Sequence, residues 1–161
     1  MSQTEAPTQN SAAPASELVL RDQEGRERRL ADFRGHNVVL YFYPKDDTPG
    51  CTVEGKEFRQ LFDQFQALDT QIVGVSTDSA ERHQAFAEKH AFQFILLADE
   101  SGELANAFGV LHGRYAARST FVLDRDLKVR RTFHDVTPRG HAQHVLDFVR
   151  SILEGDRMVG G

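Results

Sequence analysis

The chain has one cysteine, and the residues around it could make that thiol reactive. Cys51 follows the segment 46–50, Asp-Asp-Thr-Pro-Gly, whose residue types favour a polar turn. If Thr48 caps a helix and Pro49 is its first residue, Cys51 lies in the first turn and the Thr48 hydroxyl can reach its backbone N–H. The positive end of a helix stabilises a thiolate, which is the nucleophilic form of cysteine. This spacing therefore predicts a reactive sulfur.

A purely structural role for the cysteine is the competing interpretation. A free cysteine next to an apolar strand is more often a small buried hydrophobic residue than a catalyst. The polar turn before Cys51 favours the reactive interpretation, because it places the thiol at a junction between a loop and a helix. Since the 161 residues contain no second cysteine, a disulfide within them is excluded and any disulfide partner must come from another molecule.

The element before the cysteine is predicted to be a buried strand. Residues 38–43 form a continuous apolar run, Val-Val-Leu-Tyr-Phe-Tyr, which Pro44 ends. Such a run is typical of a central strand that is covered on both faces of a mostly parallel sheet. Ligand sites of open α/β sheets lie outside the carboxyl ends of the strands, so Cys51 stands where such a site is expected.

Hydrophobic spacing and turn residues predict the other elements. Further strands are predicted at 17–20, 26–30, 71–75, 94–98, 119–123 and 127–133. Helices are predicted around Phe58 to Phe65, from a capping box at 78–81 to about Ala91, and from 102 to 108. A last helix is predicted to begin with Thr137 as N-cap and Pro138 as first residue, and it carries Val145, Phe148, Val149 and Ile152 at helical spacing.

This order of elements predicts an α/β fold of the thioredoxin-like type: a mixed sheet flanked by helices, with an N-terminal β-hairpin extension. We expect one domain over residues 17–153. Both ends lack periodic apolar positions, so we expect a disordered tail at 1–16 and a flexible tail at 154–161.

Composition excludes several classes of partner. The net charge of −5 and the pI near 5.8 argue against nucleic acid. No apolar stretch approaches the ~20 residues that span a bilayer, and residues 1–15 lack the apolar stretch of a secretory signal. We therefore expect a cytoplasmic protein that does not enter the membrane.

The sequence predicts neither a metal site nor a cofactor. His141 and His144 lie about one turn apart on the last predicted helix, but no carboxylate or thiol stands near them at ligand spacing, so packing or solvation is the expected role. Asp46 and Asp47 are expected to form the turn rather than to bind a cation. The chain also lacks a phosphate-binding glycine-rich loop.

Four residues match a known active-site pattern, Pro-x-x-x-Thr-x-x-Cys with an arginine far downstream: Pro44, Thr48, Cys51 and Arg118. On these residues the chain resembles the peroxiredoxins. The segment 41–52, Tyr-Phe-Tyr-Pro-Lys-Asp-Asp-Thr-Pro-Gly-Cys-Thr, resembles their bacterioferritin-comigratory, or Q-type, branch. The resemblance covers about 17–153. It implies a thioredoxin-like fold and an antioxidant thiol peroxidase that reduces hydrogen peroxide or organic hydroperoxides without a cofactor.

The resemblance also implies roles for the matching residues. Cys51 attacks the O–O bond and becomes a sulfenic acid, while Arg118 holds the thiolate and stabilises the charge that grows on the departing oxygen. Thr48 hydrogen-bonds the reacting oxygens and Pro44 shields the sulfur from water. Glu54, about one turn after the cysteine, is expected to orient Arg118.

One position departs from the branch. Many Q-type proteins carry a second, resolving cysteine five residues after the first, and here that position is Lys56. The sulfenic acid on Cys51 must therefore react with an external thiol, which could be thioredoxin, glutaredoxin with glutathione, or a small thiol. The donor and the preferred hydroperoxide stay open, and a monomer is weakly favoured by the resemblance.

Two other functions compete with the peroxidase. A thiol-disulfide oxidoreductase normally needs a Cys-x-x-Cys pair, and Thr48 stands where the first cysteine would be. A redox sensor or binding module would use oxidised Cys51 as a signal without turning over. Repeated peroxide consumption with a thiol donor distinguishes an enzyme from a sensor.

Overall fold

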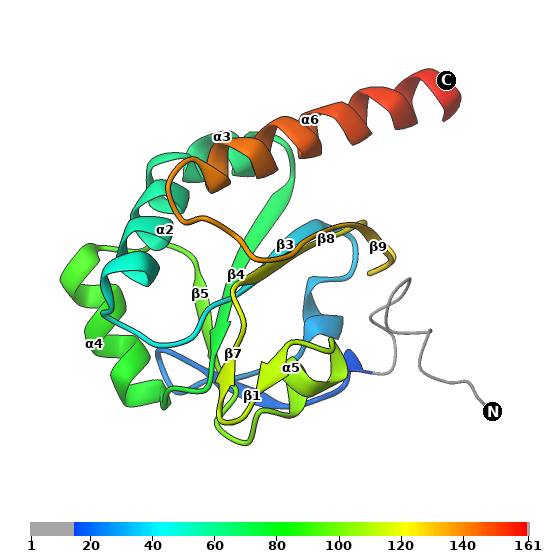
Figure 1. Ribbon diagram of the computed structural model, residues 1–161. Helices are drawn as coiled ribbons and strands as arrows, with labels where there is room; N and C mark the ends of the chain where they lie inside the picture. The colour runs from blue at the N-terminus through cyan, green and yellow to red at the C-terminus, as the bar shows by residue number, and fades with distance from the viewer. Residues whose placement is uncertain (1–14, 161) are drawn as a thin grey trace.

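A seven-stranded mixed sheet forms the centre of the computed structural model, which describes residues 15–160 (Figure 1). Its strands lie in the order β2-β1-β5-β4-β3-β8-β9. The strands are β1 (Leu20–Asp22), β2 (Glu27–Arg28), β3 (Asn37–Phe42), β4 (Thr70–Ser76), β5 (Ile95–Ala98), β8 (Ser119–Leu123) and β9 (Val129–Phe133). The strands β3, β4 and β5 are parallel to one another, and β8 is antiparallel to β3. The predicted thioredoxin-like sheet is confirmed.

Strand β3 separates two apolar layers, because its side chains alternate between the two faces of the sheet. Val38, Leu40 and Phe42 pack on one face, together with the short helices η2 (Leu30–Phe33) and α5 (Glu103–Ala107). Val39 and Tyr41 pack on the other face. All six residues of the strand are buried, as the continuous apolar run predicts.

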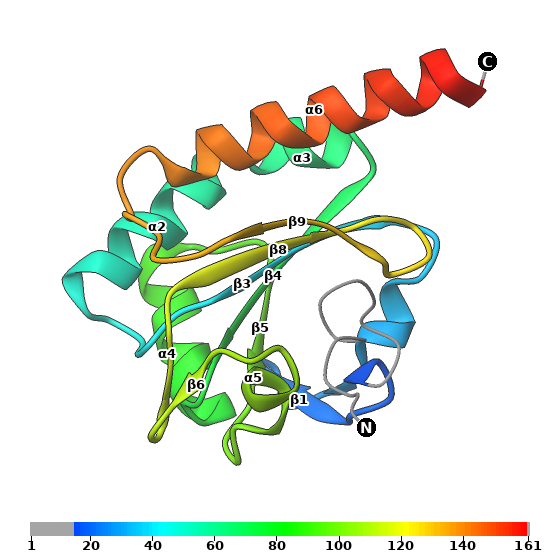
Figure 2. The ribbon, with the colours of Figure 1, turned by 45° about the vertical axis from the view of Figure 1, so that its right-hand side comes forward.

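Four helices cover the second face: α2 (Pro49–Gln60), α3 (Phe62–Ala67), α4 (Ala80–His90) and α6 (His141–Gly160). Figure 2 shows α2, α3 and α6 together on one side of the sheet, opposite α5. The predicted helix around Phe58 to Phe65 is divided at Leu61, which is both the C-cap of α2 and the N-cap of α3. Helix α4 is confirmed, but its N-cap is Ser79, whose side chain accepts a hydrogen bond from the Arg82 N–H, and not the first residue of the predicted capping box at 78–81.

The last helix differs from its predicted bounds at both ends. It begins at His141, so Thr137 and Pro138 are not its N-cap and first residue. Residues 137–140 lie outside the helix, and the Gly140 N–H donates to the Glu57 carboxylate on α2 instead of entering the helix. The helix continues to Gly160, so the predicted flexible tail from residue 154 is helical over its described part.

The N-terminal hairpin is confirmed, with a turn in which the Gly25 N–H donates to the Asp22 carbonyl. Its first strand begins at Leu20 and also pairs with β5, which joins the hairpin to the main sheet. The predicted tail at 1–16 falls mostly outside the described residues, but Ala15 and Ser16 are buried, so the prediction is wrong for these two.

Two short strands were not predicted. Strands β6 (Leu111–His112) and β7 (Tyr115–Ala116) form a separate two-stranded sheet that leads into Arg118 and β8. Within residues 15–160, no helix is long and apolar enough to cross a membrane.

The packing of α2 on the sheet can be tested at Phe58. Its ring is fully buried and stacks on Tyr41 with 4.7 Å between ring centroids. We expect Phe58→Ala to lower the free energy of unfolding, measured by urea denaturation, by about 3–5 kcal/mol, because it removes buried apolar surface and leaves a cavity. The control Val19→Ala, at an exposed position, should change it by less than about 0.5 kcal/mol. A similarly small loss at Phe58 would contradict this packing.

Candidate active site

The cysteine is positioned by the turn that joins β3 to α2. Thr48 is the N-cap residue with extended backbone angles, Pro49 is the first helical residue, and Cys51 lies in the first turn, as predicted. One detail of the prediction is wrong. The Thr48 hydroxyl donates to the Lys45 carbonyl at 2.9 Å and does not cap the helix by accepting a backbone N–H. The hydroxyl proton of Thr48 is therefore used inside the loop. No described residue donates a hydrogen bond to the hydroxyl oxygen, which can still accept one.

The sulfur of Cys51 is both buried and hydrogen-bonded to a cation. The residue is 2% exposed and packs in the apolar cluster with Tyr41, Tyr43 and Phe58. At the same time the Arg118 Nη2 donates to Sγ at 3.4 Å. The competing interpretation of a small hydrophobic residue accounts for the burial but not for a guanidinium at the sulfur.

Arg118 reaches the sulfur from the residue directly before β8, the strand beside β3. Its Nη1 donates to the Glu54 Oε1 at 2.7 Å, so one guanidinium contacts the thiol and the carboxyl group together. The Arg118 side chain is 16% exposed and that of Glu54 is fully buried. Burial opposes the charge of Arg118, but the neighbouring Cys51 and Glu54 outweigh it and raise the pKa of the guanidinium.

Glu54 is an unusual carboxyl group, because only part of it is hydrogen-bonded. Burial raises its pKa to about 7, although the Arg118 charge and hydrogen bond act in the opposite direction. Its second oxygen, Oε2, is buried and has no hydrogen-bond partner among the described residues. A carboxyl group of this kind holds a proton near neutral pH, so the site can exchange a proton without an exposed acid or base.

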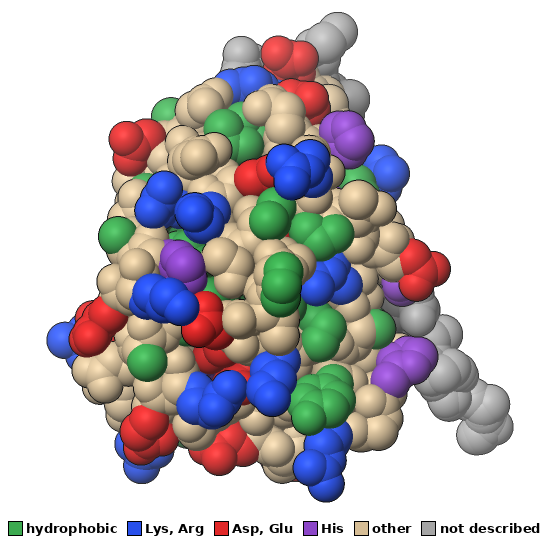
Figure 3. Space-filling view, turned by 60° about the vertical axis from the view of Figure 1, so that its left-hand side comes forward, with side chains coloured by type: hydrophobic (Ala, Val, Ile, Leu, Met, Phe, Trp, Pro, Cys, Tyr) green, Lys and Arg blue, Asp and Glu red, His purple; other side chains and the backbone are tan. Residues whose placement is uncertain are grey.

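The backbone of Arg118 is tied to the segment that follows β9. The Val136 N–H donates to the Arg118 carbonyl at 3.2 Å. A Cβ at Gly50 would stand 2.9 Å from Arg118 Nη2 and 3.3 Å from Pro138 Cγ, so a glycine lets all three approach closely. A hollow of about 250 Å³ opens here; it is lined by Pro49, Gly50, Val53, Thr137, Pro138 and Arg139. Figure 3 shows one face of the molecule, on which hydrophobic side chains gather among Lys and Arg side chains.

The structure thus brings Cys51, Glu54 and Arg118 together, with Thr48 at the start of the same helix. Pro44 follows β3 in the loop before it and is half-buried. Lys56 lies on α2 with its side chain exposed, away from the buried sulfur.

The two histidines of the last helix do not form a metal site with other described residues. His141 is buried, and its Nε2 shares a hydrogen bond of 2.8 Å with the Thr120 hydroxyl. Burial lowers its pKa to about 4, so the ring is neutral at physiological pH. His144 is exposed.

A cluster of three buried polar residues was not predicted from the sequence. Asp46, Asp78 and His83 are buried, and their ligand-type atoms lie within 4.8 Å of one another. Those of Asp46 and His83 already take part in hydrogen bonds within the protein, so the cluster is no evidence for a metal. A signal was present: His83 stands at helical spacing before the buried Phe86 and Ala87, and a histidine on a buried face needs a polar partner.

Glu54 should give the free energy of unfolding a pH dependence. Its folded-state pKa, about 7, lies above the model value of 4.5, so between these values the folded protein keeps a proton that the unfolded chain releases. This stabilisation is complete below pH 4.5 and is lost as the pH rises through about 7, by up to about 3 kcal/mol. In Glu54→Gln that loss is absent. Urea denaturation should therefore show the variant gaining stability relative to the wild type from pH 4.5 to about pH 8.

The exposed carboxylate of Glu88 provides the control for this measurement. Glu88→Gln should follow the wild-type profile across the same range. Parallel profiles for Glu54→Gln and the wild type would contradict a protonated Glu54.

Comparison with known proteins identifies the family of the chain. The model of the AhpC/TSA family matches residues 10–132. The chain is 38% identical over 148 residues to peroxiredoxin Bcp of Bacillus subtilis, covering 87% of this chain and 94% of the relative. It is 38% identical over 149 residues to the chloroplastic peroxiredoxin Q of Sedum lineare, covering 90% of this chain and 79% of that protein.

A solved structure resembles the fold closely. It is that of the bacterioferritin comigratory protein of Xanthomonas campestris, described for its alkyl peroxide reduction activity, with a TM-score of 0.84 and 35% identity. The match covers 88% of this chain and 95% of the other. The chain therefore belongs to the AhpC/TSA family, in its peroxiredoxin Q/Bcp branch, and is a thiol peroxidase.

Proposed function

We propose that Cys51 is the peroxidatic residue and that Arg118, oriented by Glu54, activates it. The observation that carries this proposal is the single guanidinium that donates to Sγ through Nη2 and to Glu54 through Nη1. The guanidinium is planar, so its bond to Glu54 through Nη1 also sets the direction in which Nη2 points. A flexible lysine side chain would not be oriented in this way.

The reaction is a displacement at oxygen. The Cys51 thiolate attacks the terminal oxygen of ROOH, the S–O bond forms as the O–O bond breaks, and the products are a sulfenic acid and RO⁻, which takes up a proton to become ROH. Arg118 lies where it can stabilise negative charge first on sulfur and then on the departing oxygen. Because the Thr48 hydroxyl donates to Lys45, its oxygen accepts the peroxide O–H. Pro44 shields the sulfur from water.

The oxidised cysteine is reduced by a thiol from outside the chain. One thiol converts the sulfenic acid into a mixed disulfide and water, and a second releases free Cys51 and an external disulfide. The exposed Lys56 at the expected resolving position and the single cysteine support this one-cysteine cycle. The hollow beside Pro49, Val53 and Pro138 offers the incoming thiol an approach to the first turn of α2.

The substrate range and the setting of the enzyme are part of the proposal. Alkyl hydroperoxides are proposed beside hydrogen peroxide because the Xanthomonas relative is described for alkyl peroxide reduction. The donor among thioredoxin, glutaredoxin with glutathione and small thiols is left to experiment. A cytoplasmic location and a monomer remain predictions, and the Sedum relative is chloroplastic by name.

Arg118→Ala should leave the protein folded but slow the reaction of Cys51 with peroxide by about 10²–10³-fold, since one preorganised donor is worth about 2.7–4 kcal/mol. Stopped-flow measurement of single-turnover oxidation gives this rate. Arg118→Lys should also be impaired, because lysine lacks the planar fork whose two nitrogens donate separately to the carboxylate and the sulfur. The exposed Arg114 offers a control, and Arg114→Ala should react normally. Normal rates in both Arg118 variants would remove this residue from the mechanism.

The fate of the oxidised sulfur tests the one-cysteine cycle. After one equivalent of peroxide without reductant, mass spectrometry should find Cys51 as a sulfenic acid or as a disulfide between two chains, and excess peroxide should give the sulfinic acid. Repeated turnover should require an added thiol and should be absent in Cys51→Ser. Peroxide consumption by a chain whose Cys51 stays unmodified would place the chemistry elsewhere. Oxidation without turnover, for every thiol offered, would favour a sensor.

A further inference from the structure

A fully buried histidine and aspartate meet beneath the loop that precedes the cysteine. The His83 Nδ1 lies 2.6 Å from the Asp46 Oδ2, and the side chains are 0% and 2% exposed. Asp46 belongs to the loop between β3 and α2, whereas His83 comes from α4. On the other side of the ring, Nε2 lies 2.8 Å from the Leu97 carbonyl of β5.

These contacts fix where the protons must be. A carbonyl oxygen only accepts, so the His83 Nε2 carries a hydrogen and donates it to Leu97. Nδ1 and the Asp46 oxygen cannot face each other at 2.6 Å without a proton between them. The second Asp46 oxygen accepts the Tyr43 hydroxyl at 2.6 Å. Both oxygens of a buried carboxyl group are thus satisfied, and removing either partner would leave a costly orphan.

The backbone of Asp46 is tied down as well. Its N–H donates to the Asp78 Oδ2 at 2.8 Å, and the same oxygen accepts the Ser76 hydroxyl. The other oxygen of Asp78 accepts from the Arg82 Nε at 2.9 Å. The loop is therefore attached at one residue to the end of β4, to α4 and, through His83, to β5.

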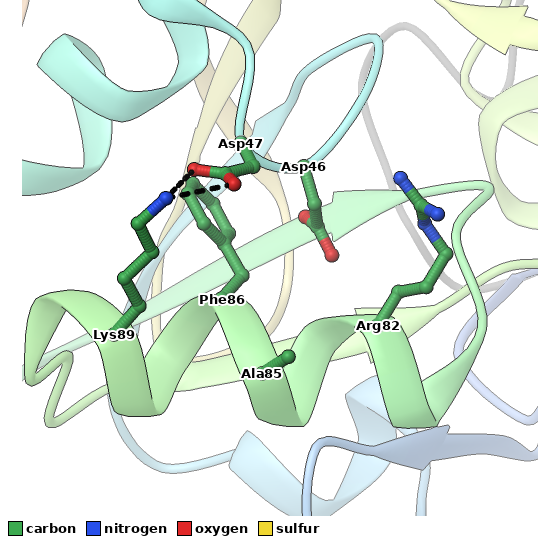
Figure 4. A pocket seen from close by; sticks show the side chains of 6 residues that line it. All are labelled: Asp46, Asp47, Arg82, Ala85, Phe86 and Lys89. Atoms are coloured by element: carbon green, nitrogen blue, oxygen red, sulfur yellow. Dashed lines mark hydrogen bonds and ion pairs between the residues drawn. The ribbon is translucent and has the colours of Figure 1, made fainter.

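The loop needs such an attachment because its next residue is in an uncommon conformation. Asp47 has φ of 63°, in the left-handed region that few non-glycine residues adopt. Figure 4 shows the loop crossing above α4, with Asp46 directed inward and Asp47 paired with Lys89. That outer ion pair is exposed and contributes little, so the buried contacts of Asp46 hold the loop.

We propose that Asp46 and His83 are a positioning pair that fixes the loop from Pro44 to Thr48, which leads into the helix that carries Cys51, and thereby sets the geometry of peroxide attack. The inference rests on the proposed function of Cys51. Asp46 stands two residues before Thr48, whose oxygen faces the peroxide, and two residues after Pro44. Loosening Asp46 displaces both groups, while the helix that carries Cys51 stays in place, as does Arg118, the residue directly before β8.

The test compares two reactions of the same sulfur in single-turnover measurements without reductant. Hydrogen peroxide requires the loop, whereas iodoacetamide alkylates the thiolate without it. In Asp46→Ala and His83→Ala the peroxide rate should fall by roughly 10- to 100-fold, as expected for a misplaced reacting group, while the alkylation rate does not fall. A merely structural role would lower both rates together, or neither.

Two further variants keep the test decisive if the alanine variants fold poorly. Asp46→Asn retains the geometry, since its amide can donate to a neutral His83 Nδ1 and accept from Tyr43, and it should restore the wild-type rate ratio. Tyr43→Phe removes one donor to Asp46 and should lower the peroxide rate selectively, by less than Asp46→Ala.

The neighbouring acid serves as the matched control. Asp47→Asn removes the ion pairs of this exposed side chain with Lys89 and with the His90 Nε2, 3.5 Å away, keeps a residue that tolerates positive φ, and should leave both rates unchanged. A loss in Asp47→Asn equal to that in Asp46→Ala, or an unchanged ratio in Asp46→Ala and Tyr43→Phe, would overturn the positioning role. Failure of the proposed function is seen separately, as a wild-type Cys51 that alkylates but does not react with peroxide.

Discussion

A single guanidinium, that of Arg118, faces two acidic groups inside the protein, and the surrounding structure depends on this imbalance of charge. If Cys51 and Glu54 were both ionised, the site would hold one negative charge in excess in a medium that screens poorly. Burial raises the pKa of Glu54 to about 7, so this carboxyl group can hold a proton, which removes the excess charge. Gly50 provides the space the guanidinium needs, and the strand β8 fixes the backbone from which it extends.

Local patterns were sufficient for most of the elements that carry this arrangement. The apolar run of β3 predicted a strand buried on both faces, and the residues of β8 were predicted without error. The capping motif at 78–81 indicated the start of α4 to within one residue, and the proline at 49 indicated the start of α2, because capping depends on neighbours a few residues away. The proximity of Arg118 to Cys51 is a long-range contact, and only the resemblance to a family indicated it.

The predictions that failed depended on contacts between distant parts of the chain. We predicted that the Thr48 hydroxyl accepts a hydrogen bond from the Cys51 N–H. The fold of the loop instead turns this hydroxyl back, so that it donates to the Lys45 carbonyl. The start of α6 is delayed because Gly140 bonds to α2, which no pattern in its own segment records. Asp46 and His83 are 37 positions apart in the sequence. The turn pattern placed Asp46 and the helical spacing placed His83, but neither pattern indicated that the two side chains meet.

The exposed position of Lys56 has a consequence for the evolution of the branch. The side chain at this place on α2 points to solvent, and substitutions at such positions usually change stability by no more than about 0.5 kcal/mol. A lineage can therefore gain or lose a thiol there without repacking the core or moving the Arg118 contact. A thiol at this place would stand in solvent while the Cys51 sulfur is buried, so a disulfide between them would require the first turn of α2 to unwind.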